Sequence, residues 1–360
     1  MKLLAAALLL FAGTLAARPA APGVNDAAIV AEGFAPKLSD YRFFTDAAVT
    51  RPAARVMGYD LETALFSDYA EKHRYLYVPA GAKARYDAEN ILGLPVGSAL
   101  IKTFGYRRGG VFRPVETRLL LHRAGGWVAL PYVWNAEGTD ADLKRAGMRL
   151  PVSFTDPSGA PRSISYAVPN QNQCKDCHAL SGTITPIGPK ARYLNHGGQL
   201  SAMVKAGLLD RAPRDAPRIA RWDDPAQPLD ARARAYLEIN CAHCHNPKGA
   251  ASNSGLFLEG SRPAGNATGI GKRPVAAGRG SGDAEFVIAP GHPEASILVY
   301  RLESTDPGIA MPELGRATVH AEGAKLLRDW IAAMPQAQAA ALARTAGSRT
   351  APAATSAPPR

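Results

Sequence analysis

The sequence is poor in cysteine and in long apolar runs, and both shortages limit what the chain can be. Only four cysteines occur among 360 residues, which allows at most two disulfides within the chain. After the N-terminal segment, no apolar run approaches the roughly 20 residues that a membrane-spanning helix needs. With 46% hydrophobic residues, the chain is long enough to bury a sizeable core in two or three domains.

The N-terminal segment is typical of a secretory signal peptide. Lys2 precedes an apolar run from Leu3 to about Ala16, and small residues follow before Pro19. We therefore expect residues 1–17 to be removed, which predicts a periplasmic protein with no membrane span after signal cleavage. No cysteine directly follows the run, which argues against a lipid anchor.

All four cysteines lie in two copies of one pattern, Cys-x-x-Cys-His. The first copy consists of Cys174, Cys177 and His178, and the second of Cys241, Cys244 and His245. Disulfides, a redox-active dithiol or a zinc site would each use the cysteines, but none requires a histidine directly after the second one. Covalent c-type haem does, because the two thiols add to the haem vinyl groups and the histidine becomes the proximal iron ligand. We therefore expect two c-type haems with their iron.

Residues 23–167 contain short β-like runs separated by glycine and proline, such as "HRYLYVPAG" and "SALIKTFGYRRGG". The stretches "AGG" and "TDPSGAP" are turn signals between apolar or alternating runs, which favours hairpins of an antiparallel sheet. We predict a β-rich, sandwich-like N-terminal domain, followed by mainly α haem regions. The domain shows no nucleophile constellation, metal cluster or phosphate loop.

Residues 168–214 form the predicted first haem-binding segment. Within it, "GQLSAMVKAGLLDRAP" has helical spacing of its apolar residues and ends at a proline. The segment is too small to enclose a haem alone, so we expect its porphyrin to be buried partly against the β-rich domain.

Residues 223–335 form the predicted second haem domain. "PLDARARAYLEIN" is a helix that leads directly into Cys241, and "HAEGAKLLRDWIAAM" is an amphipathic helix near the end of the segment. "GIAMPELGR" lies between them. This order resembles a small class I cytochrome c domain, and the resemblance implies an all-α fold in which His245 is the proximal ligand and Met311 the distal one.

Most methionines are core filler, so the assignment of Met311 needs support. Pro312 stiffens its loop, and the distance along the chain from His245 is long enough to pass around a porphyrin. A thioether opposite imidazole raises the reduction potential, which suits electron transfer.

The wider chain resembles exported bacterial dihaem c-type cytochromes with a β-rich N-terminal region. The matching stretches include "LFSDYAEKHR", "IKTFGY", "PNQNQCKDCH", "PIGPKARYLN", "ARAYLEINCAHCHNP", "PGHPEASILVYR" and "MPELGR", which extend over residues 65–330. The resemblance implies haems at both motifs, but it implies no particular substrate.

The sixth ligand of the first haem is open at the level of the sequence, because no Met-Pro pair follows His178 before the second domain. Met203 and His196 are the leading candidates. The more distant candidates are His73, His122 and Met148, and an open position is a further possibility. His243 is expected on the solvent side, and His292 and His320 on the surface.

Three functions are compatible with these features. The first is electron transfer through two haems, without catalysis. The second is a dihaem peroxidase-like oxidoreductase with an open distal site at the first haem, and the third is a β-rich binding module. The net charge of +11 could steer an acidic redox partner, although a solvated surface is an equally simple explanation. Nucleic acid is not an expected partner of an exported chain, and residues 336–360 are predicted to be disordered.

Overall fold

The computed structural model describes residues 23–46, 51–276 and 278–335. The N-terminal part is built on a six-stranded antiparallel sheet in the order β1-β2-β3-β4-β5-β6. Its strands are β1 (Val56–Tyr59), β2 (Glu71–Tyr77), β3 (Ala99–Arg108), β4 (Val111–Arg123), β5 (Gly126–Trp134) and β6 (Ala141–Leu143). Each strand pairs with the next one along the chain, so the sheet is a meander; tight turns join β3 to β4 and β4 to β5, and longer connections join β1 to β2 and β2 to β3.

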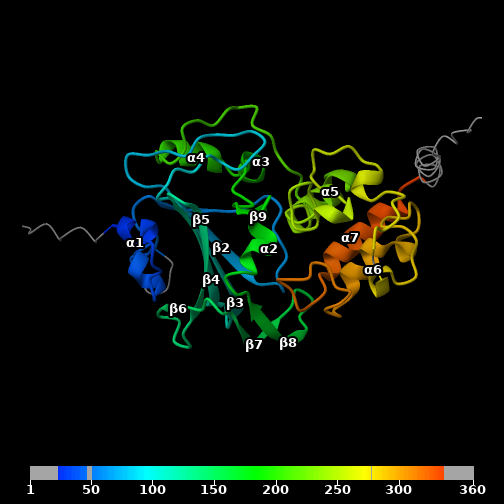
Figure 1. Ribbon diagram of the computed structural model, residues 1–360, viewed down its shortest axis with the longest axis horizontal. Helices are drawn as coiled ribbons and strands as arrows, with labels where there is room; N and C mark the ends of the chain where they lie inside the picture. Colours follow the sequence, from blue (N-terminus) through cyan, green and yellow to red (C-terminus); the bar gives the residue numbers. More distant parts are fainter. Residues whose placement is uncertain (1–22, 47–50, 277, 336–360) are drawn as a thin grey trace, which may run out of the picture.

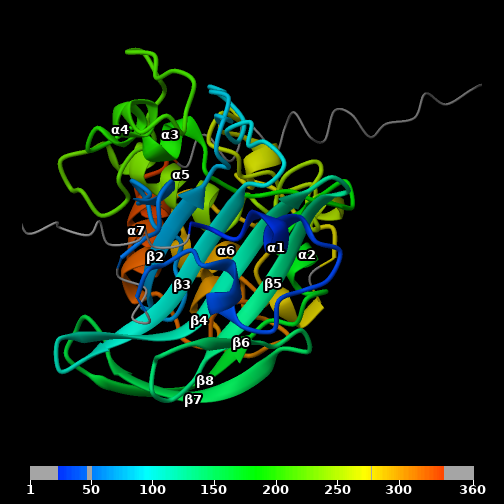
Figure 2. The same ribbon diagram turned by 90° about the vertical axis from the view of Figure 1, so that its left-hand side faces the viewer.

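One face of the sheet is covered by the N-terminal segment, which contains α1 (Asp26–Val30) and the 3-10 helix Leu38–Tyr41. Figure 2 shows α1 in front of the sheet. Alternate residues of β2 to β5, among them Tyr77, Ile101 and Leu119, point to this side and pack with the segment. The result is a conventional buried core on this face.

The opposite face has two apolar ends. At one end, Leu76 and Leu100 pack against the segment that holds α3 (Ala191–Leu194) and α4 (Gln199–Lys205). At the other end, Phe104 and Tyr106 pack against a separate hairpin of β7 (Met148–Thr155) and β8 (Pro161–Val168). Figure 1 shows α2 (Cys174–His178) beside the sheet, and the two-stranded β9 (Ala179–Leu180) and β10 (Thr183–Ile184) place this segment against β5.

The C-terminal part contains three α-helices, α5 (Leu229–Asn240), α6 (Ile297–Glu303) and α7 (Ala321–Ala332), around one apolar cluster. Gly323 of α7 lies directly against the ring of Tyr236 on α5. The lack of a side chain at Gly323 therefore sets how closely the two helices approach. Trp330 on the same face of α7 donates to Asp230 at 2.9 Å.

The connection between β1 and β2 joins the two parts of the molecule. Asp68 is 3% exposed, and its carboxylate accepts hydrogen bonds from the backbone amides of Ala317 and Thr318 at 2.8–2.9 Å. The Phe66 amide donates to Asn240 Oδ1 at 2.8 Å, and the Phe66 ring stacks on His320 at 4.3 Å. These contacts fix the loop that precedes α7 relative to the sheet.

The predicted fold class is wrong. The chain has about 26% strand and 22% helix, and it shows no clear mainly α C-terminal cytochrome region. Helices of 12, 7 and 12 residues are separated by long irregular stretches with short 3-10 turns, where glycines such as Gly255 and Gly269 adopt positive φ. Glycine in that conformation interrupts a helix. The β-rich part is one six-stranded meander, and the second sheet that packs against one end of its face is only the two-stranded β7–β8 hairpin.

The expectation that His320 lies on the surface is also wrong, since it is only 8% exposed and is surrounded by aromatic rings. The predicted signal peptide, residues 1–17, and the predicted disordered tail, residues 336–360, lie outside the described residues. No helix in the described part of the chain combines the length and the apolar character needed to cross a membrane.

Candidate functional site

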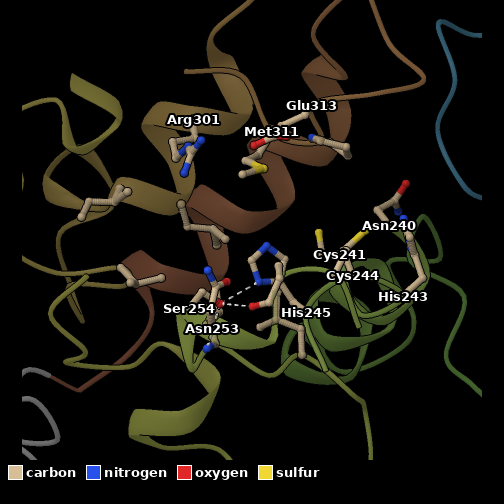
Figure 3. A pocket seen from close by; sticks show the side chains of 18 of the residues that line it. Asn240, Cys241, His243, Cys244, His245, Asn253, Ser254, Arg301, Met311 and Glu313 are labelled. Carbon is tan, nitrogen blue, oxygen red and sulfur yellow. Dashed lines mark hydrogen bonds between the residues drawn. The ribbon is translucent and has the colours of Figure 1, made fainter. Parts of the chain in front are cut away.

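The second Cys-x-x-Cys-His motif lines a cavity of about 610 Å³. Helix α5 leads into the motif. The amide of His245 donates to the carbonyl of Cys241 at 2.9 Å, and this further turn places the side chains of Cys241 and His245 on the same wall of the cavity. Met311 lies on the opposite side of the cavity, facing the ring of His245 (Figure 3). The volume is within the roughly 300–1,000 Å³ typical of ligand and cofactor sites.

The hydrogen bonds around His245 fix its tautomer. Ser254 Oγ donates its only proton to the carbonyl of Ala251 at 2.6 Å and lies 3.3 Å from His245 Nδ1. The hydroxyl can therefore only accept from this ring, so Nδ1 carries the proton and Nε2 keeps its lone pair. Burial lowers the pKa of His245 to about 4, so the imidazole is neutral at physiological pH. A neutral ring with one nitrogen oriented by a hydrogen bond is the state that binds a metal.

The loop of Met311 is held by backbone contacts with the end of α6. The amide of Met311 donates to the carbonyl of Arg301 at 3.0 Å. Arg316 Nη2 donates to the carbonyls of Met311, Arg301 and Ser304 at 2.8, 3.1 and 2.9 Å. Because Arg316 precedes the residues bound by Asp68, the sheet domain contributes to the position of the methionine.

The first motif forms helix α2. Its N-terminus is fixed by a reciprocal pair of hydrogen bonds at 2.9 Å, from the Asn170 amide to the Gln173 side chain and from the Gln173 amide to the Asn170 side chain. Burial raises the pKa of the Cys174 thiol to about 11. It lowers the pKa of His178 to about 4, and Nδ1 of that ring is buried with no hydrogen-bond partner. The first motif thus also presents a neutral imidazole and, at Cys174, a protonated thiol.

The two motifs adjoin each other in space. The potential ligand atoms of Cys177, His243 and Cys244 all lie within 4.8 Å of one another, and Cys244 Sγ donates to the carbonyl of Asp176 at 3.3 Å. The contact between Cys244 and Cys177 lowers the pKa of Cys177 and raises the pKa of Cys244. The sequence does not indicate this pairing, because it joins residues far apart in the chain.

This group of three side chains could instead hold a single metal ion, since two thiols and an imidazole are the ligands that zinc prefers. The sequence predicts that His243 lies on the solvent side, but its Nδ1 is buried in the structure. A metal ion at this place and thioether bonds at both cysteines exclude each other.

The leading candidates for the sixth ligand of the first haem are engaged elsewhere. Met203 is 0% exposed and packs in the apolar cluster with Leu100 and Leu200. His196 Nε2 lies 3.2 Å from the carbonyl of Asp60 and 2.8 Å from the Gln199 side chain. Neither residue forms a hydrogen bond with the first motif in the described part of the chain.

The more distant candidates have partners of their own. His73 stacks on Phe112 at 4.0 Å, and His122 stacks on Trp127 at 4.5 Å. Met148 is 37% exposed at the start of β7. The structure therefore does not bring an additional sequence-predicted ligand to His178.

Comparisons of the chain with protein-family models, with curated proteins and with solved structures found no match. The chemistry of the site therefore rests on its own residues. Four thiols, two neutral imidazoles and a thioether are brought together on two adjoining sites, and this donor set fits covalent haem at both motifs.

Proposed function

We propose that the protein is a periplasmic dihaem c-type cytochrome that transfers electrons. The observation that carries this proposal is the second motif, where His245 presents Nε2 to a cavity whose opposite wall holds Met311. The four cysteines are free in the structure, and thioether bonds would use all of them. A haem bound at each motif supplies one-electron redox chemistry.

The residues around the sites have separable roles. Cys174 and Cys177 would hold one haem, and Cys241 and Cys244 the other. His178 and His245 are neutral because of burial, so each can bind iron without first losing a proton. Met311 would complete the coordination of the second iron and favour its reduced state.

The adjoining motifs support transfer of electrons within the chain. Cys177 and Cys244 would each hold a different haem, and their sulfur atoms belong to one group within 4.8 Å. Two one-electron redox groups would therefore be held on adjoining segments, which favours electron transfer within the chain. The net charge of +11 suits an acidic redox partner, whose approach would be steered by opposite charge.

The substitution Met311→Ala tests this proposal at the second haem. Loss of the thioether should abolish the near-infrared sulfur-to-iron band of the oxidised protein and lower one of two midpoint potentials. The control is Met334→Ala, since Met334 packs at the edge of the C-terminal apolar cluster, away from the cavity wall. An unchanged band in Met311→Ala would show that another residue is the ligand.

A dihaem peroxidase-like oxidoreductase is the second candidate, because Met203 and His196 are both engaged elsewhere. An iron bound by His178 alone would have an exchangeable position, which reaction with a substrate requires. Such a protein, once reduced, should bind about one carbon monoxide per chain at once and then sustain peroxide turnover with an electron donor. Slow or absent carbon monoxide binding would contradict the peroxidase-like function and leave electron transfer as the proposal.

A further inference from the structure

Three cations form a row across the sheet face on the side of the first motif. Arg74 of β2 lies directly opposite Lys102 of β3, and Lys102 lies directly opposite Arg118 of β4. Lys72 follows the same face two residues before Arg74. Like charges placed directly opposite each other on neighbouring strands destabilise a sheet, so this arrangement calls for a compensating anion.

The protein's own carboxylates compensate only one member of the row. Glu116 is 0% exposed, and both of its oxygens accept from Arg118 at 2.7 and 2.8 Å. Oε2 of the same carboxylate also accepts from Tyr166 at 2.8 Å. The remaining cations, Lys72, Arg74 and Lys102, form no ion pair in the described part of the chain.

The uncompensated cations are poorly satisfied by other groups. Arg74 is 7% exposed, and its Nη2 is buried with no hydrogen-bond partner. The Lys72 ammonium group donates only to the carbonyl of Ala70, and the Lys102 ammonium group makes no hydrogen bond among the described residues. Lys102 Nζ instead lies 4.8 Å from the centre of the Phe104 ring. Burying an unpaired charge is costly, so buried Arg74 and its two half-buried lysine neighbours favour a further, anionic partner.

The row lies near the first haem-attachment motif. The charges of Lys102 and Arg118 act on His178, and that of Arg118 also acts on Cys174. Burial, followed by repulsion from the neighbouring cations, lowers the pKa of Lys72 to about 7 and that of Lys102 well below its usual range. Both lysines are only half-buried, so a group lying over the sheet face can reach them.

We propose that Lys72, Arg74 and Lys102 bind the propionate carboxylates of the first haem, and that the sheet is therefore part of its binding site. This inference rests on the proposed function. Each haem carries two carboxylates, which would compensate two of the three unpaired cations, and guanidinium and ammonium groups are the usual partners of carboxylates. Positive charge next to the porphyrin also stabilises the reduced state and raises the potential of this haem.

The test compares Lys102→Met and Arg74→Met in the intact holoprotein, with Arg108→Met as the matched control. Arg108 is an exposed cation at the end of β3, so its substitution removes the same charge away from the row. In spectroelectrochemical titrations, Lys102→Met and Arg74→Met should each lower the midpoint potential of the first haem. This haem is recognised because it lacks the sulfur-to-iron band of the methionine-ligated haem. The expected change is about tenfold in the reduction equilibrium, which is about 59 mV for one electron. Arg108→Met should leave both potentials unchanged.

The outcomes separate this inference from the proposed function. Fewer than two covalent haems in the wild-type protein would contradict the proposed function itself. If Lys102→Met and Arg74→Met carry two haems with the same potentials as Arg108→Met, the role of the row is overturned. A shift confined to the methionine-ligated haem would overturn it as well. A shift that depends on added phosphate or sulfate would assign the row to a free anion and also overturn it. Lys102→Arg should restore the wild-type potential, and a failure to do so would show that loss of packing caused the shift.

Discussion

Ser254 is the residue that most directly tunes the second site, because it orients His245. Its hydroxyl accepts from Nδ1 while donating to the carbonyl of Ala251. A ligand imidazole whose remaining N–H donates to an acceptor is more basic, and a more basic ligand favours ferric iron. With a haem bound at the second motif, as proposed, the serine would lower its potential and hold the ring towards the cavity.

The substitution Ser254→Ala should raise the midpoint potential of the methionine-ligated haem, because His245 loses its acceptor. Redox titration followed at the absorbance of that haem measures the change. Ser252→Ala, two residues away and without a side-chain hydrogen bond among the described residues, should leave the potential unchanged. A lower potential in Ser254→Ala would contradict the tautomer assigned to His245.

At the scale of elements, the contact between α5 and α7 decides how the second motif is presented. Helix α5 ends at Cys241, so a shift of α5 against α7 displaces the cysteines and His245 together. Tyr236 is 1% exposed at this crossing, and its hydroxyl is 3.0 Å from His320 Nδ1. The crossing is thus both tightly packed and fixed by a polar contact.

The substitution Gly323→Ala should lower the free energy of unfolding by about 1–3 kcal/mol, the usual cost of overpacking, because its methyl group would collide with the Tyr236 ring. The higher helix propensity of alanine offsets part of this, by up to about 1 kcal/mol. Denaturant unfolding of the holoprotein measures the difference. Gly125→Ala is the control, since nothing lies within 4 Å of the added atom. Equal stability of both variants would contradict the close approach of the helices.

Local sequence patterns predict the elements better than their arrangement. The helices predicted directly before Cys241 and after residue 319 are confirmed as α5 and α7, since both have good helix formers or a continuous apolar stripe. The mainly α region predicted between them is wrong, because residues 241–296 have no such periodicity. The resemblance supplied the all-α expectation there, and the glycines at positive φ contradict it.

The sequence predicts the site only in part, because it reveals local motifs but not contacts between distant segments. Each Cys-x-x-Cys-His motif is a local pattern, so the sequence reveals it directly. The contact of Cys177 with His243 and Cys244 depends on how distant segments pack, and the row of Arg74 and Lys102 depends on strand register. Neither relation leaves a periodic signal along the chain.

At the scale of the whole molecule, the connection between the sheet and the C-terminal helices brings the motifs together. Asp68 and Tyr69 both adopt left-handed backbone conformations, with φ of 48° and 58°, which non-glycine residues rarely do. The hydrogen bonds of Asp68 to Ala317 and Thr318 compensate this cost. The same connection carries Phe66, which contacts both Asn240 and His320.

The adjacency of the motifs predicts magnetic interaction between the two haems. The electron paramagnetic resonance spectrum of the fully oxidised protein should be broadened compared with the sum of two single-haem variants. Those variants are Cys174→Ala with Cys177→Ala, and Cys241→Ala with Cys244→Ala. A spectrum equal to the sum would show that the haems are farther apart than Cys177 and Cys244 imply.

The amount of haem that stays on the denatured chain tests the central claim most directly. The protein, produced with a cytochrome c maturation system, should retain two haems through acid extraction, as measured by intact mass and by the pyridine haemochrome. Each double-cysteine variant should retain one, because each motif attaches its haem independently. A chain that retains no haem, keeps its thiols titratable and binds one metal ion would contradict the account, and would assign Cys177, His243 and Cys244 to a metal site instead.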